Sequence, residues 1–315
     1  MDWLYSSRNL IKNKNLFQLI IPGSHNSGTY SCRRKNGISP DHVGPKWIYK
    51  IPFFASKWIV DQPDDIYQQL KTGIRWFDFR VGKDPEGVFR VYHSYYGEEF
   101  TDIFTQIIRF HREHPEEFIL INLRKFLLSN GRGFDLEQHQ LFYYQCLEIL
   151  TPYLIPAENS RDTLETLWER PKQRILIIYG DNDPHVSLVI PQLIIKNYVL
   201  DGFTKLIDIW PNKPYLNQAL HYLDQSIPDA NWKSTLIQSQ IITTPDFYKI
   251  LRGILLPCFF AYSTKTEAGR NKKGIVGWSQ KNFYRLNLVL LDWVTPDLVQ
   301  HFIDLNLKKA TEISI

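Results

Sequence analysis

Short apolar runs alternate along the chain with longer mixed segments, and this pattern predicts eight strands. Several of the runs are continuous and rich in β-branched residues, which is typical of strands that are covered on both faces. The runs span residues 16–21, 74–79, 88–92, 118–123, 174–179, 203–209, 235–241 and 288–291.

The segments between these runs carry helical or loop patterns. Apolar residues recur there at helical spacing, and Gly73 stands where a helix would end. Helices are predicted over residues 64–72, 102–113, 135–150, 163–168 and 297–308. Loops are predicted over residues 46–60, 127–133 and 264–277, the last of them mobile.

Strand–helix alternation that repeats about eight times favours a parallel (β/α) barrel over two separate domains. The length of 315 residues and the 43% hydrophobic content allow one large core. We therefore predict an α/β fold of the TIM-barrel type, with residues 1–315 as a single domain.

Composition narrows the function classes. The net charge of +4 is too small to indicate a nucleic-acid-binding protein. It fits an anionic membrane surface and an ordinary solvated surface equally well.

The cysteines and the lengths of the apolar runs indicate the cellular compartment in which the protein is expected. Cys32, Cys146 and Cys258 are far apart and lack metal-ligand spacing, so a reducing compartment is expected. The chain has no apolar run that resembles a signal peptide or approaches a membrane span of about 20 residues. We expect a cytoplasmic or peripheral membrane protein without a signal peptide, acting as a monomer.

The carboxyl ends of the predicted strands carry polar side chains, and in a barrel these ends converge on one face. In chain order they supply His25, Asp78, Arg80, His93, Arg124, Lys125, Tyr179, Asp181, Trp210, Gln240 and Asp292. Two histidines with an arginine suit phosphodiester cleavage. One imidazole removes a proton, the other donates one, and the guanidinium holds the phosphate through two hydrogen bonds.

Each of these residues also has a purely structural interpretation. His25 fits a turn, Asp78 and Arg80 fit an ion pair, His93 fits loop packing, and Asp292 fits a helix cap. The remaining histidines are predicted on solvated surface, at positions 42, 111, 114, 139, 185, 221 and 301.

Four segments in this order resemble the X domain of phosphatidylinositol-specific phospholipase C. The likeness is greatest to animal X-domain-containing proteins without pleckstrin, EF-hand and C2 modules. The segments are Ile21–His25, Lys57–Arg80 with its Gly-Ile-Arg-Trp-Phe-Asp-Phe-Arg end, His114–Glu117 and Asn287–Trp293. The resemblance implies a distorted (β/α)₈ barrel. It also implies cleavage of the glycerophosphate bond of an inositol phospholipid through an inositol cyclic phosphate, with release of diacylglycerol.

The resemblance also implies roles for single residues. His25 is the general base, His93 the general acid, and Asp292 orients His25. Arg80 holds the phosphate, and Asp78 positions Arg80 or the attacking hydroxyl. Further substrate contacts are expected from Asn26, Arg124, Lys125, Tyr179, Tyr95 and Gln240.

The family has a calcium-dependent and a metal-free branch, and this chain mixes their patterns. Asp78-x-Arg80 is of the metal-free type, whereas His25-Asn26 matches the calcium type. An arginine at the metal position repels a divalent cation, so no cofactor is expected. Calcium is the alternative, with Asn26 and Asp78 as its ligands. Because an Asp at position 26 would partner the acid histidine, its absence predicts reduced activity or a substitute carboxylate such as Asp78.

The expected partner is an inositol phospholipid at a membrane surface, with no nucleic acid. Residues 46–54 mix aromatic residues with lysines, which fits an interfacial segment or the closure of one barrel end. Two alternative functions stay open. One is a phosphodiesterase for another glycerophospholipid head group, and the other is a catalytically weak barrel that binds inositol lipids.

Overall fold

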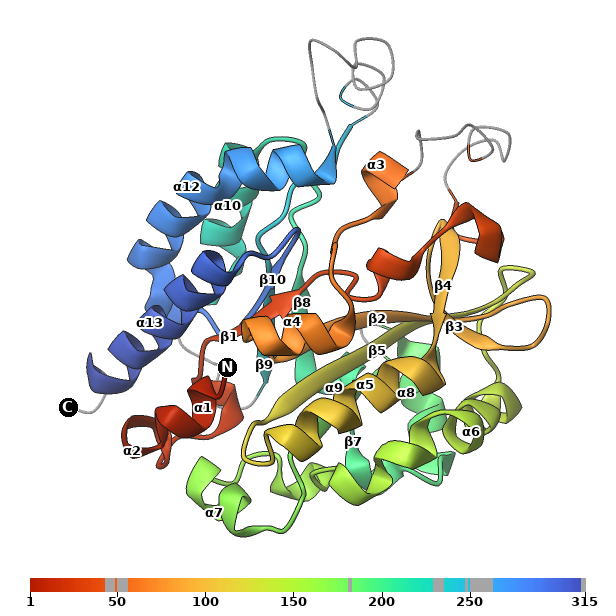
Figure 1. Ribbon diagram of the computed structural model, residues 1–315, viewed down its shortest axis with the longest axis horizontal. Coiled ribbons are helices and arrows are strands. Elements are labelled where there is room, and N and C mark those ends of the chain that lie inside the picture. The colour runs from red at the N-terminus through yellow and green to blue at the C-terminus, as the bar shows by residue number, and fades with distance from the viewer. Residues whose placement is uncertain are drawn as a thin grey trace.

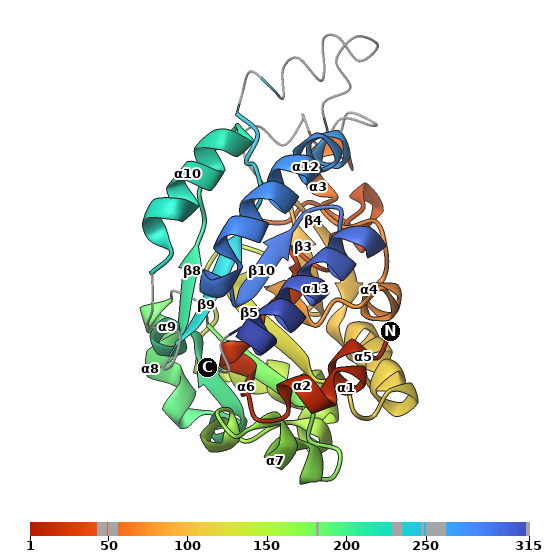
Figure 2. The ribbon, with the colours of Figure 1, turned by 90° about the vertical axis from the view of Figure 1, so that its left-hand side faces the viewer.

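Eight parallel strands form a nearly closed barrel in the computed structural model, as Figures 1 and 2 show. The structure describes residues 1–42, 49, 56–180, 183–228, 235–246, 249 and 263–312. The strands pair in the order β7 (Val199–Asp201), β6 (Ile175–Tyr179), β5 (Ile119–Leu128), β2 (Trp76–Lys83), β1 (Ile21–Ser24), β10 (Leu288–Leu291), β9 (Leu236–Gln240) and β8 (Leu206–Ile209). Within the described residues no ladder joins β7 to β8. The predicted distorted barrel is confirmed.

The predicted third strand does not belong to the barrel. β3 (Phe89–His93) and β4 (Tyr95–Glu99) form an antiparallel hairpin, and β3 pairs with the outer part of β2 through Val81 and Val91. The connection from β2 to β3 is a tight turn at Gly87, whereas a parallel partner needs a crossover of a dozen or more residues. The eighth barrel strand is instead β7, which is only three residues long and was not predicted.

Two other strand predictions were too long. Residues Leu16–Gln18 form a 3₁₀ helix that Asn15 caps, so β1 begins only at Ile21. Residues Gly202–Lys205 form the short helix α9, which begins where the Asp201 side chain accepts a hydrogen bond from Phe203 N. In both cases a local cap ends the extended conformation that the apolar residues alone favour.

Helices surround the sheet, and all five predicted helices are present. The described α-helices are α1 (Trp3–Ser6), α2 (Arg8–Ile11), α3 (Ser56–Ile59), α4 (Ile66–Thr72), α5 (Phe100–Glu113), α6 (Leu136–Gln145), α7 (Leu164–Glu169), α8 (Pro184–Val189), α9 (Gly202–Lys205), α10 (Leu216–Ser226), α12 (Thr264–Asn282) and α13 (Pro296–Glu312). The prediction for 135–150 divides into α6 and a 3₁₀ segment, Leu147–Tyr153. Gly73 ends α4 in the left-handed conformation, as predicted.

The loop predictions were partly wrong. Residues 264–277 belong to α12, which begins with a capping box between Ser263 and Thr266 and buries Ile275 and Trp278. The charged run is therefore the solvated face of a helix. β5 continues to Leu128 into the predicted 127–133 loop. Of residues 46–60, the structure describes only 49 and 56–60, so the interfacial segment 46–54 lies almost wholly outside the described residues.

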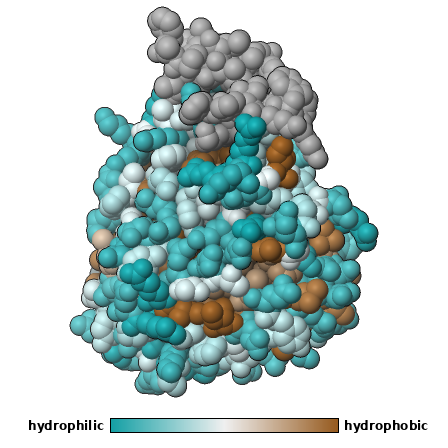
Figure 3. Space-filling view, turned by 45° about the vertical axis from the view of Figure 1, so that its right-hand side comes forward, coloured by the Kyte–Doolittle hydropathy of each residue, from teal (hydrophilic) through white to brown (hydrophobic). Residues whose placement is uncertain are grey.

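The amino end of the barrel is closed by the chain termini. Trp3 Nε1 donates to the Gly73 carbonyl at 2.9 Å, and the buried Arg75 donates from Nε to Glu117 Oε2 at 2.8 Å. α2 lies beside α13, as Figure 2 shows. The face in Figure 3 is mostly hydrophilic with scattered apolar patches. Among the described residues no helix is both long and apolar enough to cross a bilayer. The carboxyl end of the barrel is the place for a site.

Candidate active site

Two adjacent strand ends bring His25 and Asp292 together. β1 and β10 pair with Ser24 opposite Leu291, so the next residue of each strand lies at the same rim. His25 Nδ1 lies 2.9 Å from Asp292 Oδ1. When Asp292 is ionised, its oxygens only accept hydrogen bonds, so Nδ1 is the donor and Nε2 carries the lone pair. Within the described residues Nε2 makes no hydrogen bond, so it is available to a substrate.

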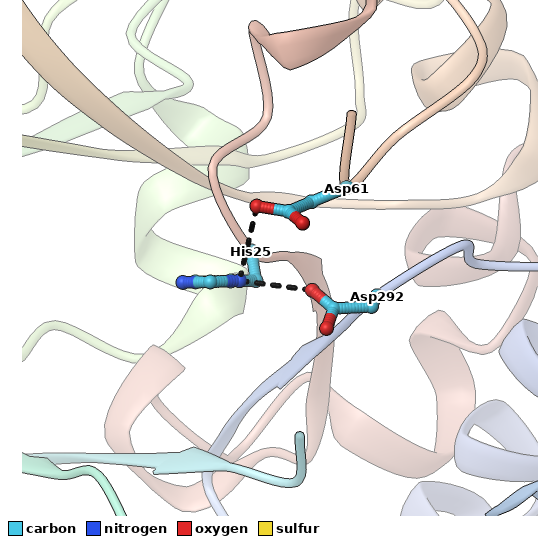
Figure 4. Close-up of side chains that lie close together, drawn as sticks. All are labelled: His25, Asp61 and Asp292. Carbon is cyan, nitrogen blue, oxygen red and sulfur yellow. Dashed lines mark hydrogen bonds and ion pairs between the residues drawn. The ribbon is translucent and has the colours of Figure 1, made fainter. Parts of the chain in front are cut away.

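A second carboxylate, Asp61, lies on the same side of the His25 ring, as Figure 4 shows. Its Oδ2 is 3.7 Å from His25 Nδ1 and 3.6 Å from His93 Nδ1. Both predicted catalytic histidines therefore flank one carboxylate oxygen. Asp61 follows the short helix α3 and was not predicted, since nothing in Asp-Gln-Pro-Asp-Asp distinguishes it from a turn.

His93 ends β3, so the hairpin rather than a barrel strand delivers it. Its Nδ1 lies 2.8 Å from the Ile59 carbonyl oxygen, which can only accept, so Nδ1 is again the donor. Burial lowers the pKa of His25 and of His93, although the charge of Asp61 opposes the shift at both. Both rings thus have a fixed Nδ1 and an Nε2 without a partner in the described chain.

Burial disfavours the charged form of both carboxyl groups beside His25, those of Asp61 and Asp292. Burial raises the pKa of Asp292 to about 8. Burial also raises the pKa of Asp61, and the nearby charge of Asp292 adds to this effect. Two carboxyl groups with raised pKa values and two imidazoles in one buried cluster form a set that can accept, hold and return protons.

Asp78 holds Arg124 rather than Arg80, which corrects one prediction. Arg124 donates from Nε to Asp78 Oδ1 and from Nη2 to Asp78 Oδ2, the latter at 2.7 Å. Although burial opposes it, this guanidinium keeps the pKa of Asp78 below its usual range. Arg80 donates instead to Asp41 Oδ2 at 3.1 Å, and its buried Nε has no partner among the described residues.

The register of the sheet decides which predicted residues face the barrel interior. Asp78 pairs with Asn122, and Arg80 pairs with Arg124, so these positions share one face. Tyr179 pairs with Leu123 and belongs to the opposite face. There its hydroxyl lies 2.8 Å from His139 Nδ1 in the outer layer. Tyr179 therefore does not face the His25 cluster, contrary to the prediction.

The other predicted substrate contacts divide similarly. Asn26 lies in the cluster: its Nδ2 donates to Asp61 Oδ2 at 2.8 Å, and its backbone N–H donates to Asp78 Oδ2 at 3.2 Å. Gln240 is buried on β9 and donates to Asp208 Oδ1 at 2.7 Å. Lys125 is exposed at the rim, and its carbonyl accepts from Tyr92.

Tyr95 and several other predicted residues stay outside the cluster. The buried Tyr95 hydroxyl donates to the Tyr49 carbonyl, so Tyr95 supports the hairpin and does not face the histidines. Trp210 is exposed and donates to Thr244, and Asp181 lies outside the described residues. The surface prediction was wrong for His111 and His139, which are 3% and 1% exposed.

Among the described residues, four of the six non-glycine residues with positive φ lie next to the polar residues of this site. Asn26, Ser94, Lys125 and Trp293 have φ values of 43°, 60°, 54° and 46°, in the left-handed region that non-glycine residues avoid. Each follows directly on His25, His93, Arg124 or Asp292. Such conformations cost about 1–2 kcal/mol each and persist where the surroundings enforce them. Four strained residues, each next to a polar residue of one cluster, indicate a functional site.

The predicted calcium ligands do not fit a metal well. Both oxygens of Asp78 accept from Arg124, whereas Asn26 Oδ1, the atom that could bind a metal, is buried without a partner among the described residues. Calcium prefers six to eight oxygen ligands, and a guanidinium beside the carboxylate repels it. His25, Asp61 and Asp292 present one ligand atom each within 4.8 Å of one another, which makes them the other metal candidate among the described residues. In this trio His25 Nδ1 and Asp292 Oδ1 already form a 2.9 Å hydrogen bond, which a metal ion would have to replace.

A cavity of about 440 Å³ lies elsewhere, between α5 and the 3₁₀ segment that follows α6. Arg109, Arg112, Glu113 and Tyr153 line it together with apolar residues. It holds no pair of histidines or carboxylates, so we place the candidate site at the His25 cluster.

Comparison of the sequence with known proteins finds similarity to PI-PLC X domain-containing proteins. The chain is 27% identical over 319 residues to PI-PLC X domain-containing protein 2 of Mus musculus, which covers 97% of this chain and 87% of that protein. It is 30% identical over 193 residues to PI-PLC X domain-containing protein 1 of Mus musculus, which covers 57% of this chain and 53% of that protein. The chain is thus similar in sequence to PI-PLC X domain-containing proteins over most of its length. No protein-family model matches it.

Solved structures agree with this relation at the level of the fold. The phosphatidylinositol-specific phospholipase C from Listeria monocytogenes superposes with a TM-score of 0.68 at 16% identity, over 97% of this chain and 98% of that chain. A mutant of the Staphylococcus aureus enzyme superposes with a TM-score of 0.67 at 17% identity, over 97% of both chains. The PI-PLC X relatives and these barrels together place the chain among proteins with a PI-PLC-like fold.

Proposed function

We propose that this chain is a phosphodiesterase that cleaves an inositol phospholipid at its glycerophosphate bond. The reaction begins when His25 Nε2 removes the proton of the inositol 2-hydroxyl. The hydroxyl oxygen then attacks phosphorus, and the bond between phosphorus and the glycerol oxygen breaks. His93 protonates that oxygen, so the products are an inositol cyclic phosphate and diacylglycerol.

One observation carries this proposal: the two imidazoles flank the same Asp61 oxygen, each with its Nδ1 bonded to an acceptor. The two rings therefore lie close together with their Nδ1 atoms held, and each Nε2, which has no partner in the described chain, is the atom that we propose takes or gives a proton. General acid–base steps of this kind each contribute about 10²–10⁴ to the rate.

The phosphate requires a cation, and Arg80 is our candidate. It lies close enough to His25 and His93 for its charge to lower the pKa of both. Its Nη1 bonds Asp41, while its Nε has no partner in the described chain. Arg124, in contrast, is paired with Asp78 in a buried part of the site. With this arrangement we propose catalysis without a metal.

The setting that follows from this function is a membrane surface. We propose that residues 1–315 act as one domain, as a monomer, and meet the lipid from the cytoplasmic side as a peripheral protein. The buried Cys32 and Cys146 form no disulfide, which suits a reducing compartment.

A lipid-panel assay tests the proposal. Purified protein is incubated with vesicles that contain phosphatidylinositol or phosphatidylcholine, with and without a chelator, and water-soluble phosphates are separated by chromatography. We expect an inositol cyclic phosphate from phosphatidylinositol alone, unchanged by the chelator. His25→Ala should abolish it, whereas His221→Ala, at an exposed histidine of α10, should not.

Three results would refute parts of this proposal. Turnover of phosphatidylcholine would change the substrate class. Loss of turnover in chelator would restore the metal-dependent alternative. Binding to phosphatidylinositol vesicles without any product would leave a lipid-binding barrel.

A further inference from the structure

We propose that Asp61 is a positioning residue that serves both histidines and holds the positive charge that passes between them. The proposal rests on the proposed function, because it assigns His25 and His93 opposite roles in one reaction. Asp61 was not a candidate from the sequence, and its place in the structure is the argument for its role.

Geometry supports the shared role. Asp61 Oδ2 lies at nearly equal distances from the two rings, 3.7 Å from His25 Nδ1 and 3.6 Å from His93 Nδ1. During the proposed reaction His25 gains a proton and His93 loses one. The net positive charge therefore moves from one ring to the other while its distance from the carboxylate hardly changes. A carboxylate so placed stabilises the imidazolium before and after the transfer.

The segment that carries Asp61 is fixed to both partners. Ile59, two residues earlier, accepts the hydrogen bond of His93 Nδ1 at 2.8 Å. Gln62, the next residue, donates from Nε2 to the His25 carbonyl at 3.1 Å and to the Leu291 carbonyl at 2.7 Å. Asp61 N–H donates to Thr29 Oγ1 at 3.0 Å. Residues 59–62 therefore join the hairpin histidine to the loops that follow β1 and β10.

The surrounding charges make Asp61 the carboxylate that both histidines share. His25 also faces Asp292, Asp78, Arg124 and Arg80, and His93 also faces Arg80 and Asp41. Asp292 bonds His25, Asp78 is paired with Arg124, and Asp41 with Arg80. Among these carboxylates Asp61 is the one that lies within 4 Å of both rings.

Asn26 and Asp61 form a hydrogen-bonded pair of an amide and a carboxylate, in which only Asp61 can carry a negative charge. Its Nδ2 donates to Asp61 Oδ2 at 2.8 Å, so amide and carboxylate occupy adjoining places. Exchanging the two residue types would preserve the hydrogen bond and move the carboxylate by about 3 Å, roughly one hydrogen-bond length. Both Asn and Asp tolerate the left-handed backbone that position 26 requires.

Histidine titration and turnover, measured on the full chain, test the proposal separately. The variants are Asp61→Asn, the exchange Asp61→Asn with Asn26→Asp, and the control Asp64→Asn, which makes the same change at an exposed position three residues away. Spectra of ¹³Cε1-labelled histidine give the pKa of His25 and His93 without substrate, with His25→Ala and His93→Ala for assignment. Phosphatidylinositol vesicles give kcat and KM.

In Asp61→Asn we expect the pKa of both histidines to fall by about 1 or more, because a charge that favours both imidazoliums is lost. We expect kcat to fall at least tenfold with KM little changed. The exchange variant should recover both pKa values and most of kcat, and Asp64→Asn should match wild type.

Two results would overturn the proposal. If kcat falls while neither pKa moves, Asp61 has only a structural role. If both pKa values fall while kcat is unchanged, the shared charge does not serve the reaction. Absence of turnover in wild type would refute the proposed function, and the titration would still decide whether Asp61 acts on both rings.

Discussion

Replacing Asp292 with Asn should make the protein more stable and less active, and the gain in stability should grow with pH. The Asp292 side chain is 13% exposed, and burial raises its pKa to about 8, whereas the usual value of an Asp is near 3.9. Between these two values the folded state keeps the proton and the unfolded state releases it. Ionisation therefore favours unfolding as pH rises.

The magnitude follows from linkage. When the unfolded state binds one proton fewer, the free energy of unfolding falls by about 1.4 kcal/mol for each pH unit. Over the full window from about pH 4 to pH 8 the upper limit is about 5–6 kcal/mol. Asn does not titrate, so Asp292→Asn escapes this loss. Burial lowers the pKa of His25 and of His93, so their titration contributes less to the comparison in the interval from pH 6.5 to 8.0.

The assay is urea unfolding followed by tryptophan fluorescence, at pH 6.5 and pH 8.0, on wild type and Asp292→Asn. From pH 6.5 to pH 8.0 the free energy of unfolding of wild type should fall by about 1.5 kcal/mol relative to that of the variant. Turnover should fall by about 10²–10⁴ in the variant, because the ionised form of Asp292, which holds His25 with its proton on Nδ1, can no longer arise. An identical pH dependence of stability in the two proteins would refute the argument that Asp292 is buried as a neutral acid.

Four further predictions concern the fold and the site. Arg75→Met should cost about 3–5 kcal/mol in urea unfolding, because it leaves the buried Glu117 without its oppositely charged partner. Gly23→Ala should cost about 1–3 kcal/mol, since its Cβ would lie 2.5 Å from the Trp76 side chain; a neutral effect would show that β1 can move from β2. Arg124→Lys should lower kcat/KM more than Lys125→Ala does, because lysine cannot make both bonds to Asp78. The pH–rate profile should be bell-shaped, as a base and an acid are both required, and a flat profile would contradict the two-histidine scheme.

Local signals in the sequence were enough for much of the fold. Gly73 and the helical spacing before it marked α4, and the alternation of apolar runs with helices indicated a barrel. The failures have local causes as well. β7 is three residues long, too short to show periodicity, and α12 carries three glycines and a charged run that obscure its helical pattern. Its buried apolar residues, Ile275 and Trp278, lie in its second half.

The site was predictable only where strands supply it. Parallel strands end on one face, so His25, Asp78, Arg124 and Asp292 could be placed together without coordinates. Tyr179 was misplaced because a shift of one residue along a strand changes the face, and register cannot be read from a continuous apolar run.

Asp61 and Asp41 were missed for a different reason. Both lie in irregular connections, where long-range hydrogen bonds rather than local pattern decide which way a side chain points. For Asp61 these are the bonds of its neighbours to the loops after β1 and β10. For Asp41 they are its contacts with Arg80 and with the backbone of Ser94.

The distribution of unfavourable features across the barrel supports a functional reading of its carboxyl end. At the amino end, the buried Arg75 is matched by Glu117 and by backbone carbonyls. At the carboxyl end, two buried carboxyl groups have raised pKa values, and four residues hold left-handed backbone next to the cluster. Each of these costs stability, and simpler residues at the same places would not. A chain under selection for stability alone would have no reason to gather them at one rim, whereas a site that moves a proton between two imidazoles requires groups whose charge is nearly balanced between two states.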